Sequence, residues 1–179
     1  DKFSTLKRSI SLIVTLTDEE LLIFYNSFTV QKLAKNELFL EEGDICDYIG
    51  FVNYGVLIYY KHKDNGDDIT IDFSFEEDWV TVNQSRLNNS ESLINIKAIE
   101  TTELLVITQQ NLSDLYIRIP KLERLGRILM EQSFLRIAQQ SIDLQLLSAT
   151  DRYKRLVCNY PKILQRVPLH HIAIYLGIA

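Results

Sequence analysis

The sequence has only two cysteines, three prolines and six glycines among its 179 residues. Cys46 and Cys158 lie far apart, so they predict neither a disulfide framework nor a zinc or iron–sulfur site. No apolar run approaches the roughly 18–20 residues that a membrane span requires, and residues 10–16 are too short and interrupted for the core of a signal peptide. The composition, 46% apolar and 24% charged, is typical of a globular protein. We therefore expect a cytoplasmic protein with no bound cofactor and no membrane partner.

The scarce positive charge is concentrated at one end. Residues 1–147 hold 14 Lys or Arg against 23 Asp or Glu, whereas residues 148–179 hold five against one, with two of the three His. A basic segment of this kind hints at a nucleic-acid partner, because cations contact phosphate groups. The five cations are Arg152, Lys154, Arg155, Lys162 and Arg166.

Residues 29–107 read as many short strands broken by turn residues. Asn65-Gly66 predicts a two-residue type I′ hairpin between strands at 56–60 and 69–73, because both residues tolerate a positive φ. This spacing of strands favours an antiparallel sandwich, roll or barrel. Before it, Thr17 predicts the N-cap of a helix with an apolar face. That face comprises Leu21, Leu22, Phe24, Tyr25 and Phe28.

A long helix is expected over residues 120–147. Pro120 suits its first turn, and only Gly126 interrupts the following run. Ile128, Leu135 and Ile142 repeat at an interval of seven, which favours a dimerisation seam. The alternative is a central helix of a monomeric core.

The tail predicts two shorter helices. One runs over 149–160 and stops at Pro161, and Pro168 opens the second, which ends at Gly177. Ala173, four residues before Gly177, makes this helix resemble the first half of a helix-turn-helix. The groove-reading helix is then expected beyond Ala179.

The sequence resembles the Crp/Fnr family of bacterial transcription regulators. The resemblance rests on residues 38–44, 48–57, 98–107, 149–160 and 165–179, and the last two segments are most similar to the subgroup common in Bacteroidetes. It implies an α+β protein with a double-stranded β-helix (jelly-roll) sensor domain of the cyclic-nucleotide-binding type at 1–118, with N-terminal helices. A dimerisation helix at 119–147 and an incomplete winged helix-turn-helix at 148–179 follow. It further implies DNA as a partner, a homodimer, a small-molecule effector, and DNA contacts from Arg166, Leu169, His170 and His171.

The family's phosphate-binding residues are replaced. Its nucleotide-binding members use a Gly-Glu pair and an Arg followed by Ser or Thr, and these align with Thr81-Val82 and Ser92-Leu93. The resulting pocket, which includes Asn83, is expected to be degenerate, and either holds another ligand or is filled by Trp79 and Leu93. Arg86 and Lys97 are possible substitutes for the missing cation, although Lys97 is expected to point outward beside Ile96. The acidic run 76–78 is expected to be a solvated turn that would repel an anion.

Two other functions are weighed against this one. A cupin-type enzyme needs several His inside the roll, and only His62 falls there, while His170 and His171 are adjacent and point apart on a helix. No nucleotide-binding, hydrolase or zinc-protease motif occurs, so we expect no catalytic or metal-binding residue. The remaining alternative is a regulatory module that binds a cyclic nucleotide or another small molecule without binding DNA.

Overall fold

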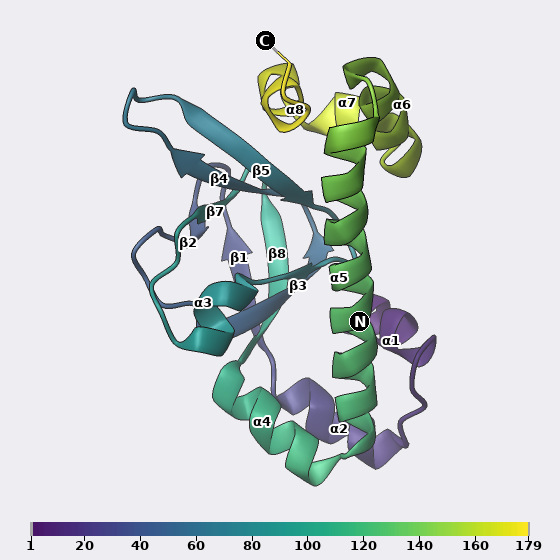
Figure 1. Cartoon of the computed structure of the whole chain (residues 1–179). Coiled ribbons are helices and arrows are strands. Elements are labelled where there is room, and N and C mark those ends of the chain that lie inside the picture. The colour runs from purple at the N-terminus through teal and green to yellow at the C-terminus, as the bar shows by residue number, and fades with distance from the viewer. Residues whose placement is uncertain (1, 179) are drawn as a thin grey trace.

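The computed structural model describes residues 2–178; Asp1 and Ala179, where the predicted helix-turn-helix segment ends, lie outside them. Two four-stranded antiparallel sheets form the centre of the molecule (Figure 1). The first has the order β1-β8-β3-β6 and the second β2-β7-β4-β5. The strands are β1 (Thr29–Leu33), β2 (Leu38–Leu40), β3 (Tyr48–Tyr54), β4 (Leu57–His62), β5 (Asp68–Ser74), β6 (Trp79–Val80), β7 (Asn95–Ala98) and β8 (Thr102–Thr108). The expected α+β jelly-roll architecture is confirmed.

Strand alternation builds the core between the two sheets. Val52 and Leu104 of the first sheet and Leu57 and Ile96 of the second are fully buried in one apolar cluster. Because neighbouring side chains of a strand point to opposite faces, Lys97 must point outward beside Ile96. Its ammonium lies 4.4 Å from the ring centre of Tyr60, so this prediction is confirmed.

The hairpin between β4 and β5 forms as predicted, but its turn differs. Gly66 has a positive φ of 85°, whereas Asn65 does not. The backbone N–H of Gly66 donates to the carbonyl of Lys63 (2.9 Å), and the loop closes between Lys63 and Asp67 (2.8 Å). A type I′ turn requires a positive φ at both central residues, so that prediction is wrong. The five-residue loop needs only one left-handed position, which Gly66 supplies.

Three helices cover the outer face of the first sheet: α1 (Ser4–Ser11), α2 (Asp18–Asn26) and α4 (Gln109–Arg118). Thr17 caps α2 as predicted, in a reciprocal arrangement with Glu20 that satisfies two backbone N–H groups. Leu21 and Phe24 are buried against the sheet, but Leu22 is exposed, so the predicted apolar face was one residue too wide. The sequence pattern does not predict α4, or α3 (Asn83–Asn88), which lies in the connection from β6 of the first sheet to β7 of the second.

The long helix α5 (Lys121–Leu146) confirms the predicted element almost to the residue. It runs along the side of both sheets, from α2 and α4 at one end to the C-terminal helices at the other (Figure 1). Leu122 and Leu125 are buried against α2 and α4. Farther along, seven large apolar side chains are exposed: Met130, Phe134, Leu135, Ile137, Ile142, Leu144 and Leu146.

The last three helices are α6 (Ala149–Asn159), α7 (Ile163–Arg166) and α8 (Leu169–Tyr175). They pack on the outer face of the second sheet, where Ile163, Ile172 and Leu176 join Ile58 and Phe73 in a third apolar cluster. Ser148 caps α6, and Gly177 follows α8 with a positive φ of 67°. Among the described residues, no helix is both long and apolar enough to cross a membrane.

Candidate functional site

Two of the predicted pocket residues turn their polar groups toward the protein itself. The hydroxyl of Thr81 donates to the carbonyl of Tyr48 at 2.9 Å. The side chain of Ser92 is buried, and its hydroxyl donates to the carbonyl of Ile94 at 2.7 Å. Val82 precedes α3 and is buried in the core between the sheets. The hydroxyls of Thr81 and Ser92 therefore donate within the protein, and Val82 contributes only an apolar side chain.

Leu93 and Trp79 do not fill the space between the sheets, so that prediction is wrong. Leu93 is 61% exposed and lies outside the strands, with its carbonyl accepting a hydrogen bond from the Lys61 ammonium (2.9 Å). Trp79 and Val80 alternate along β6, and Val80 takes the inward position. Trp79 instead packs outside the sandwich against Phe51, with ring centres 5.0 Å apart.

The turn after α3 is organised by a buried serine. The Ser85 hydroxyl accepts from the backbone N–H of Cys46 (2.9 Å) and donates to the carbonyl of Ser90 (2.5 Å). Asn89 closes the helix in a left-handed conformation, with φ 50°. The loop is thus held by its own neutral hydrogen bonds.

A cavity of about 870 Å³ lies on the other side of the first sheet, between that sheet, α4 and α5. Its size is within the range of small-molecule sites. Most of its lining is apolar, and Thr81 and Asn83 are the members of the predicted pocket that reach it. Ser92 and Leu93 do not line it. The described polar groups at its rim include Arg86, Gln109, Tyr116, Ser133 and Arg136.

Arg86 holds a half-buried positive charge at this cavity. Its Nη2 donates to Oδ1 of Asn83 (2.8 Å) and its Nη1 donates to Gln109, while Nε is buried without a partner. Burial lowers the pKa of Arg86, although a guanidinium stays ionised in proteins. Of these polar residues, the sequence indicates only Arg86 as a candidate. Gln109, Tyr116 and Ser133 lie on helices, and no local sequence motif shows that these helices contact the cavity.

The acidic run 76–78 is not a solvated turn, so this expectation is wrong for two of its three residues. Glu76 accepts from the backbone N–H of Gly55 (3.0 Å) and pairs with Arg166. Asp78 accepts from the backbone N–H of Phe75 (2.8 Å), and burial raises its pKa. Glu77 is exposed and pairs with Arg8 of α1.

The predicted DNA-binding residues fall into two groups. Leu169 and His170 are exposed. His171 is only 7% exposed, and its Nδ1 lies 2.9 Å from the Thr70 hydroxyl of β5. Burial, with the charges of His170 and Lys97, lowers the pKa of His171 to about 4. His171 is thus turned away from the exposed surface of α8, because the side of the helix that carries it packs on the second sheet.

Three of the five basic side chains are also held by the protein. Arg166 pairs with Glu76 and Glu100, and Arg155 pairs with Asp143 of α5. Arg152 donates to the carbonyls of Leu147 and Leu176, each at 2.7 Å, which ties α6 to the ends of α5 and α8. Lys154 and Lys162 are exposed, and Lys154 makes only a long ion pair with Asp151 of its own helix (3.9 Å). In this arrangement, the lysines are the cations that face solvent most freely.

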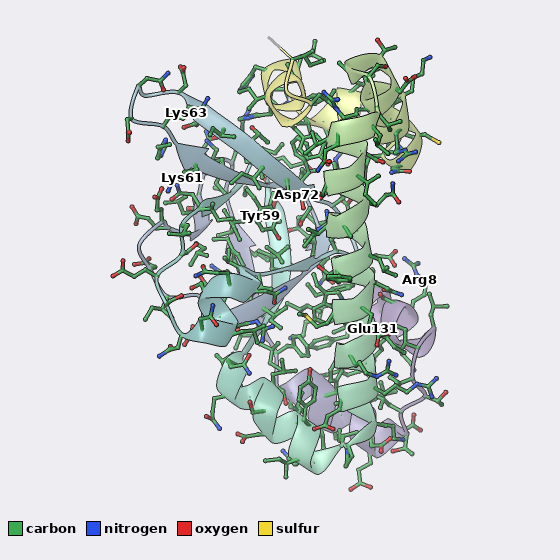
Figure 2. All side chains as sticks on the ribbon, in the orientation of Figure 1. Arg8, Tyr59, Lys61, Lys63, Asp72 and Glu131 are labelled. Carbon is green, nitrogen blue, oxygen red and sulfur yellow. The ribbon has the colours of Figure 1, made fainter. Side chains whose placement is uncertain are left out.

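The second sheet also contacts the long helix through charge. Asp72 of β5 lies beside α5 (Figure 2), and Arg136 of α5 donates to its carboxylate at 2.7 Å. By contrast, His62 lies at the exposed end of β4, where its Nδ1 is 2.5 Å from the carboxylate of Asp68. The described residues contain no cluster of three or more His, Cys, Asp or Glu side chains that could hold a metal ion.

The model of the cyclic nucleotide-binding domain matches residues 30–118. By fold, this segment is a cyclic nucleotide-binding domain. A search of the curated proteins found no match.

The fold of most of the chain is similar to that of several solved structures. FixK2 from Bradyrhizobium japonicum has a TM-score of 0.72 and 15% identity, with coverage of 85% of this chain and 78% of that chain. The catabolite activator protein of Thermus thermophilus has a TM-score of 0.59 and 20% identity, with coverage of 98% and 81%. A putative Crp/Fnr regulator from Eubacterium rectale has a TM-score of 0.66 and 18% identity, with coverage of 92% and 78%. The similarity extends beyond the cyclic nucleotide-binding domain into the helices that follow it.

The predicted dimerisation residues lie on the helix that follows the cyclic nucleotide-binding domain. Leu135 and Ile142 are exposed, and Ile128 is half-buried. An apolar stripe on a helix is normally covered, and the cyclic nucleotide-binding domain covers only the first turns of α5 on its apolar side.

Proposed function

We propose that the chain is the sensor, dimerisation and initial DNA-binding part of a Crp/Fnr-type transcription regulator and has no catalytic activity. The observation that carries this proposal is the order of its parts. A cyclic nucleotide-binding domain leads into a 26-residue helix and then into three short helices with five basic residues and one acidic residue in 148–179. An enzyme of this fold would need a cluster of metal ligands or a nucleophile with its base.

DNA binding is tested with protein made from the whole gene. The protein is incubated with a random pool of DNA duplexes, and the retained duplexes are sequenced. We expect a palindromic consensus, since a two-fold dimer binds two half-sites. Affinity should fall steeply as salt rises, because binding releases counterions from the phosphates. A lack of any retained DNA at low salt would refute the proposal and favour the module that binds a small molecule without DNA.

The contribution of the exposed lysines provides a sharper test. Lys154→Gln and Lys162→Gln should each weaken binding uniformly across sequences and lower the salt slope by about 1, as expected for a lost phosphate contact. Lys35→Gln, in an exposed loop of the sandwich, is the matched control and should leave the slope unchanged. Equal slopes in all three variants would contradict phosphate contacts from these helices.

We infer that the exposed apolar stripe of α5 pairs with the same helix of a second copy. Leu135→Asp and Ile142→Asp should convert a dimer into a monomer, because each carboxylate would be buried in the seam without a partner. Ile117→Asp, on α4, changes an exposed apolar residue away from the stripe and should stay dimeric. Light scattering at micromolar concentration distinguishes these states, and a monomeric unmodified protein would disprove the dimer.

The regulator should not respond to cyclic nucleotides. Neither Thr81-Val82 nor Ser92-Leu93 supplies the cation or the carboxylate that a cyclic phosphate and its ribose require. Calorimetry with cyclic AMP and cyclic GMP should detect no binding in the micromolar range. Micromolar binding of either nucleotide would contradict the degenerate-pocket assignment.

A further inference from the structure

One corner of the cavity gathers hydrogen-bonding side chains from two helices, beside a third. Arg86 comes from α3, Gln109 and Tyr116 from α4, and Gly126 of α5 lies against the Tyr116 hydroxyl. Figure 1 shows α3 above α4, with both to the left of α5. We call Arg86, Gln109, Tyr116 and Gly126 the Arg86 corner. Ser92 and Leu93 are not part of it, because they do not line the cavity.

The charge at the Arg86 corner is not balanced by a carboxylate. Three described arginines line the cavity, and two of them have acidic partners: Arg136 pairs with Asp72 (2.7 Å) and Arg127 with Glu131 (2.6 Å). Arg86 donates only to the neutral side chains of Asn83 and Gln109 within the described chain. A partly desolvated cation without a counter-ion is costly, so an anion that reaches it would be stabilised strongly.

Tyr116 provides a second donor beside this charge. Its hydroxyl makes no hydrogen bond to the described residues, although it lines the cavity. Burial raises the pKa of Tyr116, the positive charge of Arg86 opposes that shift, and the charge of Glu123 adds to it. A Cβ at position 126 would collide with the hydroxyl, and the glycine therefore leaves room for the phenol at this corner.

The remainder of the cavity is suited to an apolar body. Phe24, Phe28, Trp79, Leu112, Leu129 and Met130 are among its lining residues. Acidic side chains Asp78, Glu77 and Glu123 also line it, and they would disfavour a ligand with several negative charges. The single unpaired cation, the apolar lining and the acidic residues together favour a hydrophobic molecule of modest size with one anionic group, which would lie at the Arg86 corner.

We propose that the Arg86 corner binds the carboxylate of an apolar organic acid, and that such an acid is the effector of this regulator. The second part of this proposal rests on the proposed function. Arg86 and Tyr116 donate hydrogen bonds to the carboxylate, and Asn83 and Gln109 hold the guanidinium in place. The acid's apolar part occupies the space between the first sheet and α5. A bound acid therefore contacts the helix that leads to the C-terminal helices.

The test uses two acids of ten carbons, decanoate and 4-phenylbutyrate, with their uncharged amides as controls. We expect at least one acid to raise the melting temperature and to bind in calorimetry, because a ligand that binds only the folded state stabilises it. Neither amide should do so. Preference for decanoate would assign an acyl-chain ligand, and preference for 4-phenylbutyrate an aromatic one.

Variants of the chain make the assignment specific. Arg86→Gln should weaken acid binding roughly tenfold to a hundredfold, and Tyr116→Phe roughly threefold to tenfold, as expected for charge-assisted and ordinary hydrogen bonds. Arg127→Gln removes a cavity arginine that already has an acidic partner and should bind the acid normally. The melting temperature of each unliganded variant verifies that it folds.

Two outcomes would overturn the assignment: no binding of either acid by the folded protein, or equal binding by Arg86→Gln. The outcomes for the proposed function are separate. If the whole-gene protein selects a DNA sequence but binds neither acid, this inference fails and the regulator stands. If an acid binds through Arg86 but no DNA is retained, the site stands and the DNA-binding function fails.

Discussion

Arg166 of α7 donates hydrogen bonds from Nη1 and Nη2 to the two carboxylate oxygens of Glu76, at 2.8 and 2.7 Å. The same guanidinium also pairs with Glu100, in the connection between β7 and β8. Tyr160 stacks on Phe75 nearby, with ring centres 4.9 Å apart. The C-terminal helices are therefore docked on the second sheet through a charge cluster as well as through apolar contacts.

Release of the charge cluster should loosen that docking. Arg166→Gln leaves Glu76 and Glu100 without their shared cation, and the two carboxylates then repel each other. We expect the backbone amides of α7 and α8 to exchange with solvent about tenfold faster or more, because local opening sets their protection. Hydrogen exchange read by mass spectrometry measures this change, and Lys162→Gln, an exposed cation next to α7, is the control. Unchanged exchange in Arg166→Gln would show that the apolar contacts alone hold the helices.

As the pH falls, protonation of His171 should destabilise the docked C-terminal helices before protonation of Glu76 does. Unfolded His171 takes up a proton near pH 6.5, whereas the buried side chain does so only near pH 4. The unfolded state thus binds more protons in this window, and the free energy of unfolding falls as the pH drops through it. We expect a loss of about 1–3 kcal/mol between pH 6.5 and 4, measured by urea titration. The groups facing His171 are His170, Lys97 and Asp68.

The matched variants separate His171 from the other titrating groups. His171→Gln should flatten the difference in stability between pH 6.5 and 4, because glutamine does not titrate there. His170→Gln changes an exposed neighbour and should retain the wild-type pH dependence. If both variants behave alike, His171 does not govern this part of the profile.

Glu76 contributes to the pH profile only at lower pH. Partial burial raises its pKa, but hydrogen bonds from Arg166 and from the backbone N–H groups of Glu76 itself and Gly55 outweigh that effect, and the pKa falls to about 2. A carboxyl with a lowered pKa stabilises the fold fully above its unfolded value of 4.5 and loses that contribution as the pH approaches 2. The pair with Arg166 therefore persists through the window in which His171 titrates.

The elements that the sequence predicts best are those with a long or repeated pattern. The predicted helix at 120–147 differs from α5 by a single residue at either end. Its signals, the starting proline and the long run that follows, are local in the sequence and need no tertiary contact to be recognised. β6 has two residues, which is too short for alternation to appear in a sequence. The turn at Asn65-Gly66 is not the predicted type I′ turn. The hydrogen bond between Lys63 and Asp67 closes a longer loop, so the dipeptide alone does not set the turn type.

The candidate sites depend on contacts between distant segments, and sequence predicts these poorly. His171 looks like a surface residue of an amphipathic helix until Thr70, 101 positions away, is placed beside it. Arg166 is basic in sequence, yet its charge is taken up by Glu76, 90 positions away. The tertiary partners of a charged side chain decide whether it remains available to a ligand.

Two glycines with similar backbone angles should respond very differently to a methyl group. Gly55 has a φ of +107°, and an added Cβ would lie 2.6 Å from the Cα of Thr102, a backbone atom of β8 that has no room to move. Gly43 has a φ of +95° but no atom within 4 Å of the same position. We expect Gly43→Ala to lower the free energy of unfolding by about 1–2 kcal/mol, the cost of a left-handed alanine. Gly55→Ala adds the displacement of a central strand and should cost at least about 2 kcal/mol more. Urea titration of both variants provides the comparison, and equal losses would mean that β8 moves freely where the structure has it packed.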